Sequence, residues 1–535
     1  MQQKAVDQWT REIPVVAERG EITDRNGVVL ASNLDTYTVF VRPSAIVDKA
    51  FVADLFSEVL SLNRDEFYQK LTTSKVSELT VKKHVEKEKI LALLPYSING
   101  FYYARDNTRV YPYGEFLSQV LGFTSSDGYG QSGLELYCNT DLSGINGEIL
   151  YETDLTGKEL AGSNSVYYPA QNGLNVELTI DFEIQTIAER AMEEAMLRYS
   201  PKSASCIVLD PSSGEILALA IKPSFNLNEI PRNDLDLLSS LSRNTFFSDV
   251  YEPGSTFKIL TTAANLEEYY KGNPAYSPKE IFSSARTRQV ARTTVKCWNA
   301  HQNGKHSAQT ISDALNNSCN PCFVDMALRM GKEKMYEYLR LFGYGEKTGV
   351  DFGGEANGLV VPEKAVTLSD LARISFGQTI AVTPLQLATA TAAAINGGIY
   401  YSPYLVKRVY DDKGNTVFKK YPQEKRRAIS EKTSRELALL LENVVTNGSG
   451  KKAYLEGYRV GGKTGTAQKY ENGVIAQGKY VSSFVGFFPA NKPQYLCLVI
   501  VDEPKGESYG SVVAAPYAAQ IFQGIIQSKQ LKPVL

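Results

Sequence analysis

The sequence is short of several kinds of residue, and each shortage narrows what the protein can be. Its 535 residues include only six cysteines and three histidines. No uninterrupted apolar run reaches the roughly 18 residues that a membrane-spanning helix needs, and the N-terminus lacks the layout of a signal peptide. Basic and acidic residues almost balance, for a net charge of −2 without a basic cluster, so we expect no nucleic-acid partner.

Length and pattern divide the chain into at least two domains, because 535 residues exceed what one hydrophobic core supports. Residues 1–170 hold polar, β-rich segments with frequent turns, which predict an elongated N-terminal support with a charge-rich helical insert at 49–94. Residues 171–535 begin with strand, helix and hairpin patterns, continue with helices and end with three strands and a helix. This order predicts an α+β domain in which helices pack on one antiparallel sheet.

The first candidate for chemistry is Glu252-Pro-Gly-Ser-Thr-Phe-Lys258, where a turn leads into a predicted helix. Positions three apart share one face of a helix, so the Ser255 hydroxyl and the Lys258 amine can touch and act as a nucleophile and its base. The helix N-terminus adds free backbone N–H groups where an oxyanion would develop. An ordinary helix start is the alternative, and Ser449-Gly-Lys-Lys452 has the same spacing in a loop.

Two further motifs lie later in the chain. In Gly462-Lys463-Thr464-Gly465-Thr466, at the edge of a predicted strand, the lysine offers a cation for a carboxylate, the threonines offer donors, and Gly465 lets a ligand approach the backbone. Lys347-Thr348-Gly349 repeats part of this pattern without a strand around it, so we prefer the later copy. Ser318-Cys-Asn320 follows a predicted helix. The same Ser-x-Asn pattern recurs elsewhere in the chain, so this copy is a candidate only because it lies between the other two motifs.

The order of Ser255-x-x-Lys258, Ser318-x-Asn320 and Lys463-Thr-Gly465 is typical of penicillin-binding proteins and class A β-lactamases. The chain resembles a class B penicillin-binding protein over nearly its whole length, and three early segments are similar to that family's pedestal motifs: Arg19–Ala31, Arg109–Pro112 and Gly130–Glu135. The resemblance implies a dimerisation-type pedestal at 1–170 and a transpeptidase domain at 171–535, with a sheet sandwiched by helices as in serine β-lactamases. It also implies a single membrane span ahead of the first motif, missing from this sequence, and two domains outside the cytoplasm.

The resemblance further implies a D,D-transpeptidase that cross-links peptidoglycan stem peptides ending in D-Ala-D-Ala. The catalytic residues would be Ser255, Lys258, Ser318 and Asn320, and the residues that bind the substrate would be Lys463, Thr464, Gly465 and Thr466. Ser255 would form an acyl-enzyme, with Lys258 as its base and Ser318 as a proton relay. β-Lactams, which mimic D-Ala-D-Ala, would acylate the same serine, and a membrane glycan polymerase would be a partner.

Three alternatives stay open at this stage. A β-lactamase would need a placed glutamate for deacylation, and no Glu-x-x-Leu-Asn occurs between Ser318 and Lys463. A D,D-carboxypeptidase would differ only in using water as the acceptor. A non-catalytic cell-wall scaffold would act through residues 1–170. The sequence also leaves open whether the protein serves cell division, elongation (cell shape) or sporulation.

The cysteines and histidines gather in one window. Three of the six cysteines and two of the three histidines lie within 26 residues: Cys297, His301, His306, Cys319 and Cys322. We hypothesise a structural zinc held by Cys297, Cys319 and one or two of the other three side chains, behind the Ser318 motif. The resemblance adds that some class B members carry a metal site with a histidine and a cysteine at positions like His306 and Cys319. Inert buried thiols and a Cys297–Cys319 disulfide are the alternatives, and no organic cofactor is expected.

Overall fold

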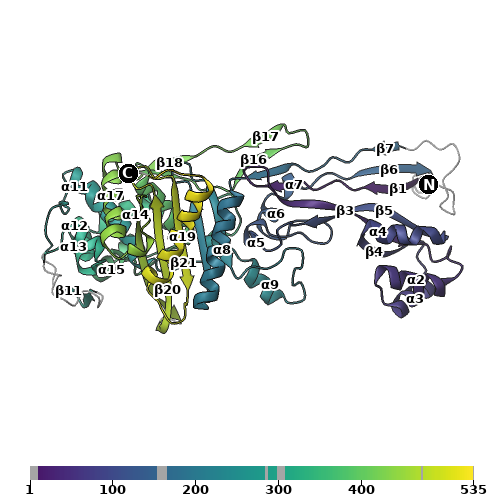
Figure 1. Ribbon diagram of the computed structural model, residues 1–535, viewed down its shortest axis with the longest axis horizontal. Helices are drawn as coiled ribbons and strands as arrows, with labels where there is room; N and C mark the ends of the chain where they lie inside the picture. The colour runs from purple at the N-terminus through teal and green to yellow at the C-terminus, as the bar shows by residue number, and fades with distance from the viewer. Residues whose placement is uncertain (1–9, 153–165, 283–286, 298–307, 472–473, 534–535) are drawn as a thin grey trace.

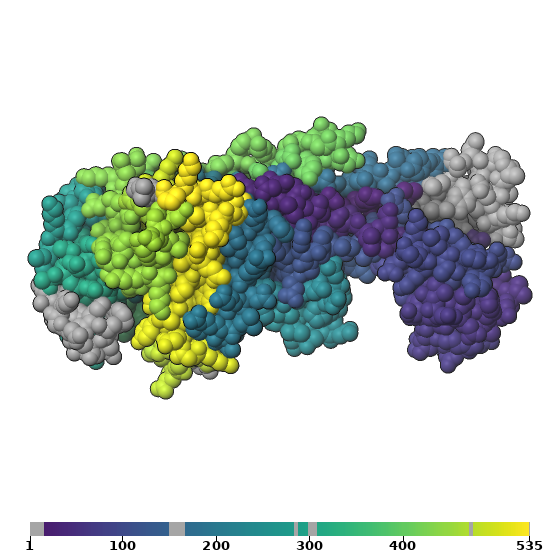
Figure 2. Space-filling view, viewed as in Figure 1, coloured from purple at the N-terminus to yellow at the C-terminus, as the bar shows by residue number. Residues whose placement is uncertain are grey.

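Figure 1 shows an elongated molecule with the N-terminal strands and a helical head at one end and the C-terminal sheet with its helices at the other. The computed structural model describes residues 10–152, 166–282, 287–297, 308–471 and 474–533. In the space-filling view the head, which contains residues 49–94, stands apart from the rest of the molecule (Figure 2). The predicted multidomain α+β architecture is confirmed.

The N-terminal part is rich in strands. Its strands are β1 (Thr10–Val15), β2 (Ile22–Thr23), β3 (Val29–Val41), β4 (Leu79–Val85), β5 (Phe101–Val110), β6 (Gly147–Glu152), β7 (Val166–Tyr168) and β8 (Asn175–Leu178). Its helices are α2 (Lys49–Leu60), α3 (Arg64–Thr73), α4 (Lys87–Leu93), α5 (Ser118–Leu121), α6 (Gly133–Tyr137) and α7 (Asn139–Leu142). The insert at 49–94 is therefore not wholly helical, because β4 interrupts it and pairs with β3.

The hairpin predicted around Asn26-Gly27 forms between β2 and β3. Gly27 has a φ of +88°, a conformation that glycine adopts without steric cost. The Asp24 carboxylate fixes the turn by accepting hydrogen bonds from the N–H groups of Asn26 and Val28, both at 2.8 Å. The short-range signal was sufficient here because turn and strand preferences agree.

The three pedestal motifs meet at Glu135, whose carboxylate is fully buried. Arg19 and Arg109 donate to its two oxygens at 2.6 and 2.7 Å, and the Tyr111 hydroxyl donates to one of them at 3.3 Å. A buried carboxylate is tolerated only when it is paired in this way. These motifs therefore hold the pedestal together.

Pedestal strands share a sheet with strands from far along the chain. Strand β8 pairs in parallel with β2 and antiparallel with β16 (Val406–Tyr410), and β17 (Thr416–Lys419) adds the outer strand. The β16–β17 hairpin can be followed along the upper side of Figure 1. An ion pair at 2.9 Å between Arg25 and Glu215 adds a further link between the two parts.

The C-terminal part is built on a five-stranded antiparallel sheet in the order β10-β9-β21-β20-β19. Its strands are β9 (Ser203–Leu209), β10 (Ile216–Lys222), β19 (Gly461–Glu471), β20 (Val474–Phe488) and β21 (Tyr495–Asp502). Helices α8 (Phe182–Tyr199) and α19 (Ala515–Ser528) cover one face, and α11 (Lys258–Tyr270), α13 (Asn320–Met330) and α16 (Pro384–Ile395) lie on the other (Figure 1). Neighbouring residues of β9 lie in different hydrophobic cores. Val208 belongs to the core that contains α8 and α19, and Ile207 belongs to the core on the other face of the sheet. The predicted sandwiched sheet is confirmed.

Other helices and strands also belong to this part. They are α9 (Leu235–Ser242), α10 (Thr245–Ser248), η2 (Gly254–Phe257), β11 (Thr287–Val290), β12 (Thr293–Lys296), α12 (Ile311–Asn316), α14 (Lys332–Leu341), α15 (Leu368–Ile374), β15 (Ile399–Tyr401), β18 (Glu424–Arg427), α17 (Glu431–Asn447) and α18 (Gly510–Val513). The β11–β12 hairpin had not been predicted. Among the helices of the described residues, none has both the length and the apolar character to cross a membrane.

Candidate active site

Ser255 lies in a tight 3-10 turn, η2, that leads directly into helix α11. Gly254 has a φ of +55°, which favours glycine, and its N–H donates to the Gly377 carbonyl at 3.0 Å. The Thr256 hydroxyl donates to the carbonyl of Pro253 at 2.7 Å. These bonds fix the turn and place Ser255 at the wall of a cavity.

The amine of Lys258 joins two of the predicted motifs. Its Nζ lies 3.1 Å from Ser255 Oγ and 3.0 Å from Ser318 Oγ, and it donates to the Ser318 carbonyl at 2.8 Å and to Asn320 Oδ1 at 2.7 Å. The carbonyl and amide oxygens can only accept, so they take two N–H bonds. A neutral amine has two N–H groups and one lone pair, so its lone pair is still available to accept a proton from a hydroxyl.

Burial controls the charge of this lysine. Lys258 is fully buried, and the loss of hydration lowers its pKa to about 8, although nearby thiols counteract part of this effect. Lys463 is also fully buried, and its pKa is well below the ordinary lysine value because of burial and the charge of Lys258. A neutral Lys258 is therefore accessible close to neutral pH.

The Ser318 motif reaches the same point through an unusual turn. Ser318 has a φ of +51°, and Asn320 begins helix α13 two residues later, after the N-cap residue Cys319. A left-handed residue other than glycine costs on the order of 1 kcal/mol, so the surrounding structure must hold it in place. The result is that both the carbonyl and the hydroxyl of Ser318 face the Lys258 amine.

Strand β19 forms another wall of the site, next to the Ser255 turn. Of the four predicted substrate-binding residues, Thr466 lines the cavity, whereas Lys463 and Thr464 are buried. A Cβ added to Gly465 would lie 2.5 Å from Ser483 Oγ and 3.0 Å from Thr256 Cγ2. Glycine is therefore required here because the strand itself packs closely against the Ser255 turn, a reason the sequence did not suggest.

Ser449, which only repeats the spacing of the nucleophile motif, also lies at the site. Its hydroxyl accepts a hydrogen bond from Thr464 Oγ1 at 3.3 Å, and its N–H donates to the Asn316 carbonyl at 3.1 Å. It therefore links β19 to the segment before Ser318. By contrast, Thr348 of the second Lys-Thr-Gly copy is fully buried and its N–H donates to Glu355 at 2.7 Å, a structural role.

The cavity at Ser255 has a volume of about 300 Å³. Its polar lining includes Ser255, Asn320 and Thr466, and also Lys296 of β12, Arg373 of α15 and Gln378. The last three were not predicted from the sequence. No local pattern marks Lys296 or Arg373, because these two reach the cavity only through the packing of β12 and α15. Gln378 belongs to Gly377-Gln378, which resembles a stretch of the family's transpeptidase domain.

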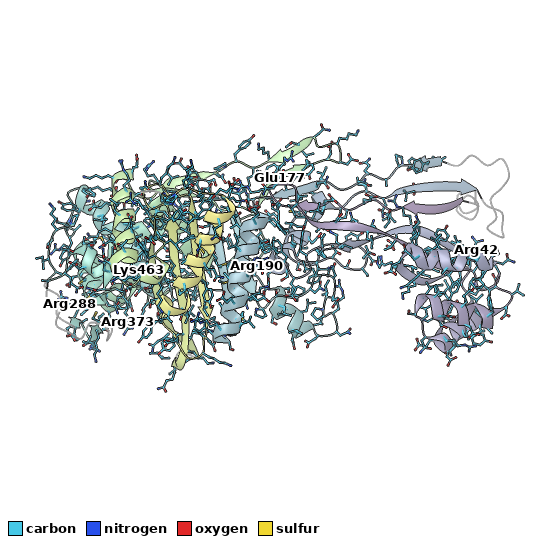
Figure 3. All side chains as sticks on the ribbon, in the orientation of Figure 1. Arg42, Glu177, Arg190, Arg288, Arg373 and Lys463 are labelled. Carbon is cyan, nitrogen blue, oxygen red and sulfur yellow. The ribbon has the colours of Figure 1, made fainter. Side chains whose placement is uncertain are left out.

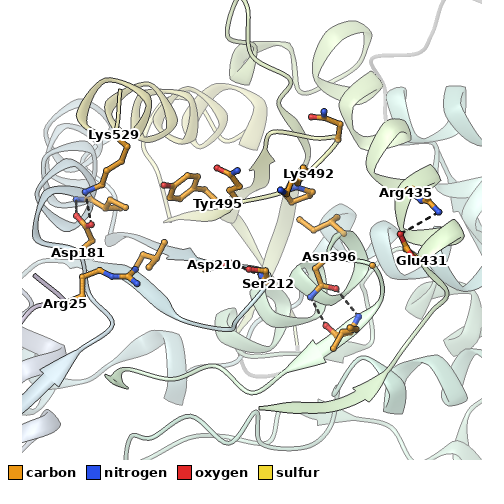
Figure 4. Close-up of a pocket in the computed structure, with 18 of the residues that line it drawn as sticks. Arg25, Asp181, Asp210, Ser212, Asn396, Glu431, Arg435, Lys492, Tyr495 and Lys529 are labelled. Atoms are coloured by element: carbon orange, nitrogen blue, oxygen red, sulfur yellow. Dashed lines mark hydrogen bonds and ion pairs between the residues drawn. The ribbon is translucent and has the colours of Figure 1, made fainter. Parts of the chain in front are cut away.

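A larger cavity, of about 640 Å³, is lined by a different set of residues, most of which Figure 4 draws. Its charged groups are largely paired: Lys529 contacts Asp181 at 2.8 Å, and Arg435 lies 3.7 Å from Glu431. None of the predicted catalytic residues is among those that line it in the described chain. The smaller cavity is the candidate active site because it contains the nucleophile.

Three of the five predicted metal ligands come together behind Ser318. The thiols of Cys297 and Cys322 form hydrogen bonds to Cys319, which lower the pKa of the Cys319 thiol, and all three residues are buried. All six cysteines are free thiols, so the Cys297–Cys319 disulfide does not occur in this structure. His301 and His306 lie outside the described residues, and within those residues no group of three or more His, Cys, Asp or Glu side chains could hold a metal ion.

Known proteins match this fold along the whole chain. Residues 204–523 match the penicillin-binding protein transpeptidase domain, and residues 14–178 match the penicillin-binding protein dimerisation domain. Stage V sporulation protein D of Bacillus subtilis is 38% identical, over 99% of this chain and 81% of that protein. A peptidoglycan D,D-transpeptidase FtsI homolog of Mesostigma viride is 30% identical, over 99% of this chain and 91% of the relative. Penicillin-binding protein 3 of Mycobacterium tuberculosis, solved with ampicillin, matches with a TM-score of 0.74 at 25% identity over 97% of both chains.

A serine on a tight turn, a buried lysine three residues later and a sheet sandwiched by helices define the class of serine acyl-transfer enzymes that includes penicillin-binding proteins and class A β-lactamases. With its dimerisation domain ahead of the transpeptidase domain, the chain belongs to the class B penicillin-binding proteins.

Proposed function

We propose that this protein is a serine D,D-transpeptidase that cross-links peptidoglycan stem peptides ending in D-Ala-D-Ala. The observation that carries the proposal is the position of the Lys258 amine, within 3.1 Å of the hydroxyls of both Ser255 and Ser318. The relatives named as peptidoglycan D,D-transpeptidases support this substrate, and the ampicillin complex of the solved relative supports inhibition by β-lactams.

The first half of the reaction forms the acyl-enzyme. Ser255 Oγ attacks the carbonyl carbon of the penultimate D-Ala while its proton passes to Nζ of Lys258. The backbone N–H groups of Ser255 and Thr466 stabilise the tetrahedral oxyanion, by about 3 kcal/mol per donor. The Ser318 hydroxyl, 3.0 Å from Nζ, relays this proton from Lys258 to the amine of the leaving D-Ala as the C–N bond breaks, which leaves Lys258 neutral again.

The second half transfers the acyl group. The amine of a neighbouring stem peptide attacks the Ser255 ester and loses its proton to Lys258. Lys258 returns this proton to Ser255 Oγ as the ester bond breaks, which restores the serine hydroxyl. Asn320, held by Lys258 at 2.7 Å, orients the peptide amide, and the terminal carboxylate of the donor binds at Thr464 and Thr466, beside Lys463. Thr466 already faces the cavity, so it makes the first contact.

The ratio of the aminolysis product to the hydrolysis product distinguishes a transpeptidase from a D,D-carboxypeptidase. With a D-Ala-D-Ala donor and an amino-acid acceptor, we expect the aminolysis product to increase with acceptor concentration at the expense of hydrolysis. Hydrolysis alone at every acceptor concentration would indicate a D,D-carboxypeptidase. Rapid turnover of penicillin would indicate a β-lactamase-like hydrolase, although no carboxylate lines the cavity among the described residues. A protein that does neither would be the scaffold.

We also propose the structural zinc. Cys297, Cys319 and Cys322 supply soft sulfur ligands in one place, and His301 or His306 would complete a tetrahedral set. The metal would support the Ser318 motif from behind and would take no part in the chemistry.

Removal of the metal provides the test. Elemental analysis should find about one zinc per chain, and chelation should lower both the melting temperature and the rate of penicillin acylation. Cys319→Ala should lose the metal, whereas Cys497→Ala, which truncates a buried thiol in the other core, should retain it. Metal-free protein that melts and acylates like the untreated protein would leave inert buried thiols as the explanation.

We infer the place of the protein in the cell from what the same relatives support. They support a cell-wall enzyme that works outside the cytoplasm in association with the membrane, with the anchor expected from the resemblance. The name of the Bacillus subtilis relative supports a role in sporulation more than in division or elongation. The pedestal would contact a membrane glycan polymerase.

A further inference from the structure

The catalytic cavity carries positive charge that the proposed chemistry does not use. The charged residues among the described residues that line it are Lys296 of β12 and Arg373 of α15, and both side chains are exposed. The carboxylate-binding threonine, Thr466, comes from a different wall, strand β19. A peptide bound at Ser255 therefore meets a cationic surface beyond the place of its terminal carboxylate.

Within the described residues, Arg373 makes no hydrogen bond or close ion pair with the acidic groups near it, although its positive charge favours the ionised form of both Glu252 and Asp370. The Asp370 carboxylate, on the same helix, accepts hydrogen bonds from the N–H and hydroxyl of Thr367. Glu252, three residues before the nucleophile, uses one oxygen to accept the N–H of Thr379 at 2.8 Å, and its other oxygen is buried without a partner. Within the described part of the chain, the Arg373 guanidinium has no hydrogen bond and no ion pair within 4 Å.

We propose that Arg373 binds a second carboxylate on the donor stem peptide, and that the enzyme thereby prefers stems whose third residue carries a free carboxylate. This inference rests on the proposed transpeptidase function. The acyl group on Ser255 is the fourth residue of the stem, and its neighbour is one residue, about 3.5 Å of extended chain, further along the cavity. A guanidinium group binds a carboxylate through two parallel hydrogen bonds. A lysine side chain or an amide on the peptide cannot accept this pair of hydrogen bonds.

Lys296 strengthens this assignment. Its carbonyl accepts from Asn320 Nδ2 at 3.4 Å, a long contact that places β12 beside the residue expected to orient the substrate amide. Its amine then adds a second positive charge on the same rim of the cavity. Together the two cations favour an anionic peptide over a neutral or basic one.

The test compares two pentapeptide donors that differ only at the third residue, a diamino acid with a free side-chain carboxylate or the same residue with that carboxylate amidated. Without any acceptor, the release of D-Ala from the wild-type enzyme should favour the free carboxylate by about ten-fold in kcat/KM, the size expected of one charged hydrogen-bonded pair. Arg373→Gln should remove this preference mainly by raising KM for the carboxylate donor. The matched control is Arg190→Gln, an exposed arginine of α8 on the other side of the sheet (Figure 3), which should keep the preference.

Acylation by a fluorescent penicillin separates this inference from the function on which it rests. The wild type should be labelled at Ser255, because the label needs the nucleophile and carries no third residue. A variant that loses activity equally on both donors, or keeps the preference, would overturn the assignment while penicillin acylation still supports Ser255. A preference seen only when the acceptor carries the carboxylate would also overturn it, since the carboxylate would then belong to the other strand. Failure of the wild type to acylate would contradict the transpeptidase itself.

Discussion

Ser255→Ala is expected to abolish both penicillin attachment and transpeptidation. Removal of the nucleophile leaves no atom to form the acyl-enzyme, so the rate should fall to background, a loss on the order of 10⁶-fold by comparison with other serine nucleophiles. Rates of D-Ala release from a pentapeptide donor and gel fluorescence after labelling with a fluorescent penicillin measure the two effects independently.

The fold should survive this change. Among the described residues the hydroxyl makes one hydrogen bond, with Lys258 at 3.1 Å, so its removal should cost no more than about 1 kcal/mol in the free energy of unfolding. An unchanged melting temperature therefore shows that the lost activity is chemical. The control is Ser449→Ala, which removes a hydroxyl from the same site but not the nucleophile, and which should keep stable penicillin attachment.

Lys258→Ala is expected to give the second largest loss, about 10³-fold in the rate of acylation. The variant removes the group that takes the Ser255 proton and leaves the Ser318 carbonyl and Asn320 Oδ1 without their donor. Because this buried site can also lose stability, the melting temperature must be measured beside the rate. A folded variant that acylates at the wild-type rate would show that another group is the base.

The pH profile of the wild type tests the same role without a substitution. Burial lowers the pKa of Lys258 to about 8, and only the neutral amine can accept a proton. The acylation rate should therefore increase about ten-fold per pH unit below this pKa and level off above it. A rate that is flat between pH 6 and 9 would contradict a neutral Lys258 as the base.

The sequence predicted those elements whose signals are local. The helix pattern expected near the start of residues 171–535 corresponds to α8, Phe182–Tyr199, whose apolar residues recur with helical period and whose start is capped by Asp181. The hairpin β11–β12 escaped prediction because Ala291, with a φ of +49°, stands in its two-residue turn where asparagine or glycine would have given a signal. Strand β4 was hidden in a segment whose alternating charges suggested a helical surface.

The catalytic motifs could be located from their order in the sequence. The burial and backbone geometry on which their chemistry depends could not be predicted in this way. Nothing in the sequence around Lys258 indicates that its amine is fully buried, or that Ser318 adopts a left-handed conformation to reach it. Arg373 is an exposed arginine on a seven-residue helix, and only the packing of α15 places it at the cavity. Such properties depend on contacts between segments far apart in the chain.

The most direct test of the central claim is to trap the acyl-enzyme with a peptide donor and to map the added mass by tandem mass spectrometry. A thioester analogue of the stem peptide, quenched in acid before the acceptor reacts, should add the mass of the acyl peptide once per chain. The account predicts that the modified fragment contains Ser255 and that fragmentation assigns the mass to this residue. Attachment to any other residue, or turnover of the donor without a covalent intermediate, would contradict it.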